Sequence, residues 1–417
     1  MSLYTEPQQS AVAIIETLRS GIPTRISTRA LPDLRSYLSE KIHEDLKRFQ
    51  AGEVPPGRLV WGQYGQGKTH MLTTVEHMAL DMGFAVSRLT LSREVSCHQI
   101  FPFYGQLAAS LLTPNSVVMG LHKRLAERSA RDFQKSVLAT PGRYIHPLPQ
   151  QIAEDFFHAE GEDQALLYGD LTGTRLPLKE LRRIHKSARQ SALPAFSESF
   201  KQLIHTPAYF AVMADLVQFC GYKGWVLLVD EIELLGRLGK LSRMRAYLNL
   251  SWLLNGAQNL NFPVYLLGAV ATRLQDDTWY GGQGGARKKP DDRTVMPELA
   301  GEKFGKEAQD TLTHFFRQAI SKDSPIMRPV HENELSALLE ELIQLHGQAY
   351  QWAAQLDISE LLHYLGSQPV RTYIRAALEA LDRQYLYGHT EKLAASALVE
   401  HALHEDESFF NSEQTNE

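Results

Sequence analysis

The sequence is poor in the features that mark secreted, zinc-binding and membrane-spanning proteins. Only Cys97 and Cys220 occur among 417 residues, and neither has further metal ligands at close spacing. This argues against a disulfide framework or a zinc site and fits a reducing cytoplasm. No uninterrupted apolar run approaches the roughly 18 residues that a membrane helix needs. The first ten residues, MSLYTEPQQS, have neither a basic start nor an apolar core. We therefore expect no secretory signal and a cytoplasmic protein with no membrane partner.

Positive charge is also in short supply. The chain has 43 Lys and Arg against 48 Asp and Glu, a formal net charge of −5. Bulk electrostatics therefore do not attract it to nucleic acid, and any contact with DNA needs a local basic patch. One run of basic residues lies on an expected helix, and we interpret it first as a solvated helix face, with contact to a phosphate backbone or a partner as the alternative. The run consists of Lys179, Arg182, Arg183, Lys186 and Arg189.

A glycine-rich segment, GQYGQGKT, fills every fixed position of the phosphate-binding loop pattern G-x-x-x-x-G-K-[ST]. A short apolar strand is expected before it at 58–61, and apolar residues recur at helical spacing after it, from 71 to 82. In this context the glycines let main-chain N–H groups point at phosphate oxygens, and the helix N-terminus adds positive charge. The alternative is a plain glycine turn in an unrelated fold. We predict a nucleotide site formed by Gly62, Gln63, Tyr64, Gly65, Gln66, Gly67, Lys68 and Thr69.

Within this loop two side chains have distinct predicted roles. Lys68 is expected to contact the β- and γ-phosphates of ATP. The hydroxyl of Thr69 is expected to bind Mg²⁺. The sequence therefore predicts ATP and Mg²⁺ as cofactors.

A second element follows a continuous apolar segment at 225–229. Continuous apolar runs are typical of parallel strands that are buried on both faces. The segment ends in the acidic pair Asp230 and Glu231, the pattern of a Walker B element. We expect Asp230 to hold Mg²⁺ and Glu231 to act as the general base toward the attacking water.

Two further polar residues stand where nucleotide hydrolases of the AAA+ class carry sensor groups. Thr272 follows an expected strand at 263–271 and is our prediction for the sensor-1 residue. Arg371 begins an expected helix at 369–386, inside a C-terminal region with only helical patterns, and is our first choice for the sensor-2 residue. Arg375 is the second choice, and surface salt bridges are the alternative for both.

The segment 279–293 has the composition of a flexible loop and contains Arg287, Lys288, Lys289 and Arg293. A loop without a catalytic role is the default interpretation. The sharper hypothesis is that one arginine reaches the nucleotide of a neighbouring subunit and stabilises charge on the transferred phosphoryl group.

These elements predict an α/β fold: a P-loop AAA+ core with a parallel β-sheet sandwiched by helices, a large helical insertion and a C-terminal all-helical lid domain. Further helices are expected at 8–20, 33–50, 104–112, 241–257 and 346–365, and a further strand at 84–91. The expected divisions are an N-terminal helical segment at 1–52, the core at 53–325 with its insertion at about 113–222, the lid at 326–400, and an acidic disordered tail at 401–417.

Five short segments of the sequence point to one particular family. IIETLRSGIP, LVWGQYGQGKTHML, MGFAVSRLTL, VLLVDEIELL and PVRTYIRAALEALD look like the ATP-binding proteins of bacterial BREX phage-defence systems, including the BrxD type. The likeness covers 10–112, 224–273 and 330–385. The family usually has a Pro-Arg pair before the lid helix, whereas here Val370 separates Pro369 from Arg371.

The resemblance implies an ATPase in phage defence that works with a helicase or another defence protein and contacts DNA. From the residues we predict an AAA+ ATPase that binds and hydrolyses MgATP, as a nucleotide-dependent homo-oligomer. The alternative function is a nucleotide-gated switch that loads DNA or a helicase and turns ATP over slowly. A scaffold with a vestigial site is a third reading.

Overall fold

The computed structural model describes residues 7–20, 25–114, 116, 118–255, 264–281, 291–321 and 324–388, so the predicted acidic tail at 401–417 lies outside the described residues. The chain forms two compact units, each assembled from separate stretches of sequence. The first unit comprises Met1–Ser39, Gly62–Thr74 and Met327–Glu417, and the second comprises Glu40–Trp61 and Val75–Ile326.

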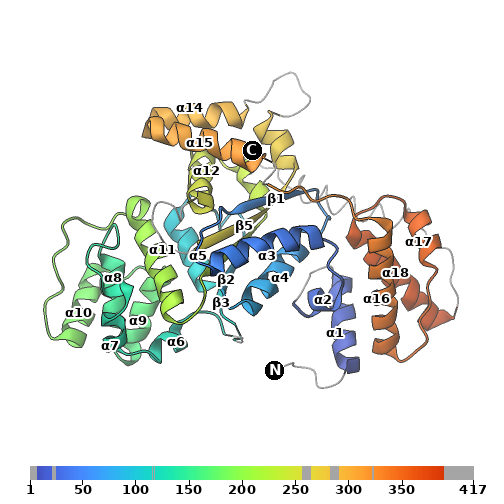
Figure 1. Ribbon diagram of the computed structural model, residues 1–417, viewed down its shortest axis with the longest axis horizontal. Helices are drawn as coiled ribbons and strands as arrows, with labels where there is room; N and C mark the ends of the chain where they lie inside the picture. Colours follow the sequence, from blue (N-terminus) through green and yellow to red (C-terminus); the bar gives the residue numbers. More distant parts are fainter. Residues whose placement is uncertain are drawn as a thin grey trace, which may run out of the picture. The chain divides into compact units, whose positions relative to one another are not determined.

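A five-stranded sheet forms the centre of the second unit (Figure 1). Its strand order is β1-β5-β4-β2-β3. The pairs β2–β4 and β4–β5 are parallel, and the short β3 runs antiparallel to β2. The structure thus confirms a mixed α/β fold with a mostly parallel sheet. The strands are β1 (Arg58–Gly62), β2 (Ala85–Thr90), β3 (Leu111–Leu112), β4 (Trp225–Asp230) and β5 (Val264–Ala271).

Helices pack on both faces of this sheet. Phe49, on α3 (Ser36–Gln50), lies with its ring centroid 6.4 Å from that of Tyr265 on β5. Tyr265 pairs with Val226, the neighbour of Trp225 on β4. Because neighbouring residues of a strand point to opposite faces, Trp225 lies on the other face. There its ring is 5.9 Å from Phe210 of α11 (Gln202–Phe219). The predicted sandwich of helices around the sheet is therefore present at β4 and β5.

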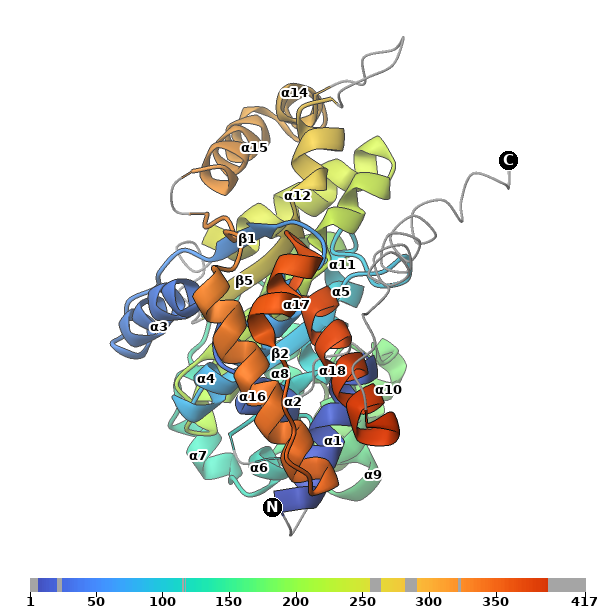
Figure 2. The same ribbon diagram turned by 90° about the vertical axis from the view of Figure 1, so that its right-hand side faces the viewer.

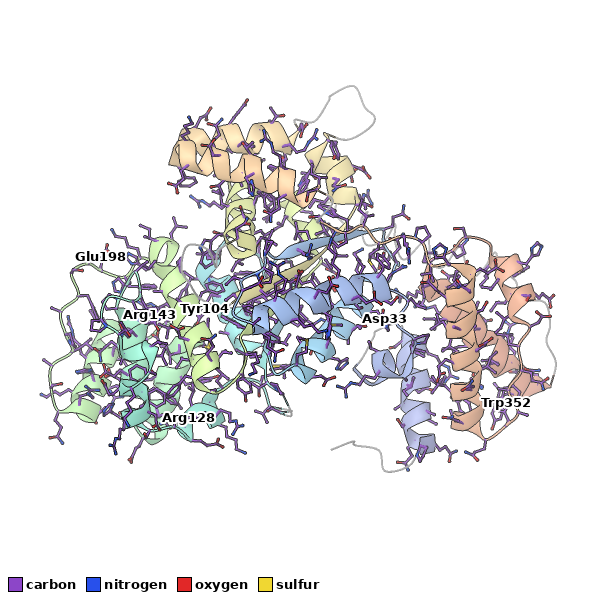
Figure 3. All side chains as sticks on the ribbon, viewed as in Figure 1. Asp33, Tyr104, Arg128, Arg143, Glu198 and Trp352 are labelled. Atoms are coloured by element: carbon purple, nitrogen blue, oxygen red, sulfur yellow. The ribbon has the colours of Figure 1, made fainter. Side chains whose placement is uncertain are left out.

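The region predicted as a helical insertion is helical, and its helices cluster beside α11 (Figure 1). Arg143 (labelled in Figure 3) holds this region to α11, since its guanidinium donates to both carboxylate oxygens of Asp215, at 2.7 and 3.0 Å. The Tyr144 hydroxyl donates to the same carboxylate at 2.6 Å. The helices before α11 are α5 (Ile100–Ala109), α6 (His122–Ala126), α7 (Ala130–Gln134), the 3₁₀ turn η1 (Val137–Ala139), α8 (Leu148–Phe156), α9 (Gly161–Leu171) and α10 (Leu178–Arg189).

Three more helices of the second unit form a group that Figure 1 shows together: α12 (Lys240–Asn255), α14 (Asp292–Phe304) and α15 (Lys306–Ala319). A buried ion pair joins the first two, since Arg243 donates to both carboxylate oxygens of Asp292, at 2.6 and 2.9 Å. The Tyr247 hydroxyl also donates to Asp292, at 3.0 Å. No pattern in the sequence predicted α14 or α15.

The first unit is helical apart from the glycine-rich segment. Figure 2 shows α1 beside α16 and α18, and these helices pack on one another. Asp382 of α18 accepts hydrogen bonds from Arg19 of α1, at 2.5 Å, and from the buried His346 of α16, at 2.9 Å. Trp352 (Figure 3) donates to the second nitrogen of His346 at 2.9 Å. The helices are α1 (Pro7–Ser20), α2 (Arg25–Ala30), α16 (Glu332–Tyr350), α17 (Ile358–Leu365) and α18 (Val370–Tyr387).

Two predicted helices are wrong in their bounds. The helix expected at 104–112 ends at Ala109, and Leu111 and Leu112 instead pair with Ser87 and Val86 as β3. The helix expected at 346–365 is two helices, because Gln351 adopts a left-handed backbone, with φ 56°, and ends α16. The second of these two helices, α17, begins at Ile358. The carboxylate of the N-cap residue Asp357 accepts a hydrogen bond from the Glu360 amide.

Among the described residues, no helix is long and apolar enough to cross a membrane.

Candidate functional site

The predicted phosphate loop joins β1 to α4 (Lys68–Asp81). Gly65 and Gly67 have φ of 74° and 85°, in the left-handed region that residues with a side chain rarely enter. The Gln63 amide donates to the side-chain oxygen of Gln66 at 2.8 Å, so the loop closes on itself. The buried Lys68 ammonium donates to the carbonyls of Gly62 and Gln63, at 3.3 and 3.1 Å. The sequence therefore folds as the tight glycine loop, followed by a helix, that its pattern predicts.

A buried arginine supports this loop. The Arg35 guanidinium donates through Nη2 to the carbonyl of Gln66 at 3.0 Å. Arg35 is only 4% exposed, and burial lowers the pKa of its guanidinium. Its Nη1 is buried and has no hydrogen-bond partner among the residues that the structure describes. Sequence reasoning missed Arg35, because no pattern connects it to a loop 31 residues away.

The tip of the loop also touches the residue that precedes α18. A Cβ placed on Gly65 lies 2.8 Å from the Cβ of Pro369, closer than real Cβ atoms approach. Pro369 is the N-cap of α18, and Arg371 is the second residue of that helix. The contact thus brings the first turn of α18, which carries the predicted sensor-2 residue, to the phosphate loop. Arg375 lies one turn further along α18.

The predicted acidic pair lies at the end of β4, whose six residues are all buried. Asp230 is 3% exposed, and one oxygen of its carboxylate accepts from the Glu231 amide at 3.0 Å. Glu231 has φ 57° and ψ 37°, a left-handed conformation that costs a side-chain-bearing residue about 1–2 kcal/mol. Strained backbone of this kind gathers at functional sites, where the surrounding structure maintains it.

A third acidic residue connects this pair to the predicted sensor-1 residue. Glu233 lies in the 3₁₀ turn η2 (Ile232–Arg237), and its side chain accepts from the Ala271 amide at 2.9 Å. Ala271 is the last residue of β5, and Thr272 follows it. Since β4 and β5 are parallel neighbours, Asp230, Glu231 and Thr272 emerge at the same edge of the sheet. Sequence patterns predicted these three residues but not Glu233.

At the same edge the Leu91 amide, just after β2, donates to the Asp230 carbonyl at 3.1 Å. The following loop and α5 line a small cleft that includes Arg93, His98 and Gln99. Burial and the nearby Arg245 lower the pKa of His98. The cleft is therefore lined by polar groups and by the opposite charges of Arg93 and Glu94, beside the strand ends.

Comparison with known proteins bears on the first third of the chain. Residues 7–154 match the family described as BREX system ATP-binding protein BrxC/D. The predicted resemblance to BREX ATP-binding proteins is confirmed over these residues. A search of curated proteins found no match. The BREX-matched segment contains both Arg35 and the whole phosphate loop, whereas Asp230, Thr272 and Arg371 lie beyond it.

The segment predicted as a loop at 279–293 is described at 279–281 and 291–293, and Arg293 lies within α14. Trp279 is buried, and its indole donates to the Tyr247 hydroxyl at 3.0 Å. Arg293 pairs with Asp291 at 2.8 Å and stacks on Tyr280, 4.0 Å from the ring centroid. The other three basic candidates for a trans contact, Arg287, Lys288 and Lys289, lie outside the described residues.

The basic run on α10 is partly neutralised. Arg183 pairs with Asp163 and Glu180, at 2.5 and 2.6 Å, and Arg189 pairs with Glu154 at 2.9 Å. The other members of the run, Lys179, Arg182 and Lys186, are exposed.

Proposed function

We propose that this chain is an ATPase that acts in a BREX-type defence against phage. A complete phosphate loop inside the BREX-matched segment carries the proposal, because the family description names ATP as the ligand. Within that loop, Lys68 and Thr69 occupy the two positions whose side chains bind phosphate and metal in phosphate-binding loops. The fold is a mostly parallel sheet with helices on both faces, as P-loop ATPases need.

In this proposal the phosphate loop holds the triphosphate through its main-chain N–H groups and the Lys68 ammonium. The residues present suit Mg²⁺, since the Thr69 hydroxyl and the Asp230 carboxylate supply the oxygen ligands that this hard cation prefers. The cation neutralises charge on the phosphate oxygens when bound. Glu231 accepts a proton from the attacking water, and Thr272 orients that water or the γ-phosphate.

Closure over the phosphates involves residues 326–400 as a helical lid that carries Arg371. The contact between Gly65 and Pro369 supports this part of the proposal, since it joins the loop to the start of α18. Adding a guanidinium near the phosphates stabilises charge that develops in the transition state.

The partners of the chain are also part of the proposal. By the family resemblance, the chain works with a helicase or another defence protein and contacts DNA. The exposed Lys179, Arg182 and Lys186 of α10 supply local positive charge for such a contact. Several copies assemble when ATP binds, and an arginine of one copy that reaches the nucleotide of its neighbour then completes the ATPase site.

Phosphate release from MgATP by the purified chain tests the core of the proposal. Lys68→Ala is expected to abolish binding of a fluorescent ATP analogue, with the exposed Lys306→Ala as its matched control. Glu231→Gln is expected to keep binding but slow turnover at least about tenfold, whereas the exposed Glu302→Gln is not. Equal ATP binding by the parent and Lys68→Ala would show that the loop is not the site.

Two further measurements with the same assay test assembly of several copies and contact with DNA. Turnover that rises steeply with protein concentration indicates sites completed between subunits, and turnover that rises with duplex DNA indicates a DNA-stimulated motor. Slow turnover together with an ATP-dependent increase in mass by light scattering indicates instead a switch that assembles on ATP and resets on hydrolysis.

A further inference from the structure

Three side chains far from the phosphate loop in sequence form a hydrogen-bonded series in the helical region of the second unit. Nδ1 of His185, on α10, lies 2.8 and 2.9 Å from the two carboxylate oxygens of Asp155 on α8. Nε2 of the same ring lies 3.1 Å from Oγ of Ser191, just beyond α10. A serine, a histidine and an aspartate are thus joined in the order that nucleophilic serines require.

The backbone after α10 places Ser191 beside the ring of His185. Gln190 ends α10 with φ 51° and ψ 30°, and its amide donates to the Lys186 carbonyl at 3.0 Å. This left-handed C-cap reverses the chain, so that a residue six positions after His185 returns to its ring. A left-handed glutamine is strained, because its Cβ crowds the backbone. The same left-handed C-cap ends α16 at Gln351.

The other end of the series is fixed by α8. The Gln151 side chain donates to the Asp155 carboxylate at 3.0 Å. The neighbouring Glu154 pairs with Arg189 at 2.9 Å, which ties α8 to the end of α10. Asp155 and His185 are each 3% exposed, whereas Ser191 is exposed. The two buried groups are therefore fixed by hydrogen bonds, and Ser191 is the exposed member of the series.

The chemistry of the three groups decides where the protons lie. An ionised carboxylate only accepts hydrogen bonds, so Nδ1 of His185 carries a proton and donates it to Asp155. In the neutral ring Nε2 is then an acceptor, and the Ser191 hydroxyl donates to it. The carboxylate also stabilises the positive charge that the ring gains on accepting the serine proton. This is the proton arrangement of an activated serine.

We propose that Ser191 and His185, oriented by Asp155, form a second catalytic site, which hydrolyses short-chain carboxylic esters independently of ATP. Ser191 Oγ attacks the ester carbonyl carbon while its proton passes to His185 Nε2. The ester C–O bond then breaks, and the leaving alcohol takes that proton. Water attacks the acyl-serine carbonyl carbon and gives a proton to His185 Nε2. The acyl C–O bond to Ser191 then breaks, Oγ takes that proton back, and the carboxylic acid leaves.

Two features define what the site accepts. Among the described residues, the main-chain amides of Ser191 and Ala192 donate to no other backbone group, so they are available to a developing oxyanion. Ser191 and Ala192 are both exposed. Small, unhindered esters, or acyl groups carried on a larger molecule's surface, therefore reach the hydroxyl from solvent.

A fluorophosphonate probe and p-nitrophenyl acetate test the proposal on the full chain. We expect the probe to label Ser191, as mapped by peptide mass spectrometry, and Ser191→Ala to lose at least about tenfold in both labelling rate and ester hydrolysis. Ser187→Ala, which removes an exposed serine on α10 itself, is the matched control and keeps both. ATP turnover stays unchanged in Ser191→Ala, because this residue lies outside the proposed ATPase site. Parent protein labelled no faster than Ser191→Ala overturns the proposal and leaves the series as a clamp between helices.

A second variant avoids disturbing the buried pair. We expect Ser191→Cys to react with iodoacetamide near pH 7 at least about tenfold faster than Ser187→Cys, because the imidazole draws off the thiol proton. The native thiols do not interfere, since burial raises the pKa of both Cys97 and Cys220 to about 12. Equal alkylation rates in the two variants contradict an activated position.

Discussion

The guanidinium of Arg35 donates to the carbonyl of Gln66 at 3.0 Å, and this bond ties the N-terminal part of the chain to the phosphate loop. A buried cationic donor on a loop carbonyl fixes the direction in which the neighbouring peptide N–H groups point. Those N–H groups are the ones that cradle phosphates in a loop of this kind. In the proposed function Arg35 therefore orients the loop for a phosphate ligand, without itself belonging to the pattern that identifies the loop.

Replacing Arg35 with methionine keeps most of the buried volume but removes the donor. A hydrogen bond from a charged group contributes about 1.5–3 kcal/mol. We expect the dissociation constant for an ATP analogue to rise about tenfold, with a lower melting temperature. Titration of a fluorescent analogue measures the change, and Arg182→Met, at an exposed site on α10, is the control. Unchanged affinity in Arg35→Met would mean that the loop keeps its shape without this bond.

Gly65→Ala introduces a side chain where the backbone is left-handed and Pro369 is in contact. The strain alone costs about 1–2 kcal/mol, and the new Cβ also lies 2.8 Å from the Cβ of Pro369. Gly52→Ala isolates the first effect, since Gly52 has φ 89° and nothing within 4 Å of an added Cβ. We expect Gly65→Ala to weaken ATP binding strongly and Gly52→Ala to leave it unchanged.

A double variant separates contact from strain. Pro369→Gly removes the opposing Cβ, so Gly65→Ala with Pro369→Gly is expected to recover part of the lost affinity. If the double variant binds no better than Gly65→Ala, the contact with Pro369 has no part in the effect.

Glu233→Ala removes the acceptor for the Ala271 amide and frees the strand end that carries Thr272. We expect kcat to fall about tenfold while the dissociation constant for ATP stays the same, because the Glu233 side chain holds the Ala271 amide and is not one of the proposed ATP contacts. Glu233→Gln keeps a side-chain oxygen and is expected to retain most of the rate. Equal kcat in the alanine variant and the parent argues that Thr272 needs no such support.

The left-handed backbone of Glu231 predicts an unusual order of stabilities. Glycine adopts this conformation freely, so Glu231→Gly is expected to be more stable than Glu231→Ala by about 1 kcal/mol, although both lose turnover. In the helical, exposed Glu302 the order is expected to reverse, since glycine in a helix costs about 1 kcal/mol relative to alanine. Thermal unfolding of the four variants measures both differences. A more stable Glu231→Ala would show that the conformation relaxes on substitution.

Local patterns predicted the parts of the fold in which a short segment decides its own structure. Gly65 and Gly67 lie at the left-handed positions of the loop, and the apolar run ending at Asp230 is a fully buried strand. The strand at Leu111 and Leu112 could not be predicted in this way. Two leucines after a helix continue its apolar pattern, and only pairing with β2 distinguishes them.

The supporting residues of the candidate site could not be predicted from the sequence, for a different reason. Arg35, Glu233 and Pro369 act through main-chain groups or through van der Waals contact with residues distant in sequence. Such contacts leave no periodicity and no fixed spacing in the chain. His185 lies within a noticed basic run, yet its partners Asp155 and Ser191 are brought to it by helix packing and a left-handed turn.

The first unit is assembled from three separate stretches of sequence, Met1–Ser39, Gly62–Thr74 and Met327–Glu417. Chains are made from the N-terminus onward, at about 5–20 residues per second. The phosphate loop thus leaves the ribosome long before Pro369 and α18, which ends at Tyr387, are available to pack beside it. A growing chain therefore carries the glycine-rich loop before the helix that packs beside it has been made, and the surroundings of the proposed ATP site are complete only after α18 has been synthesised.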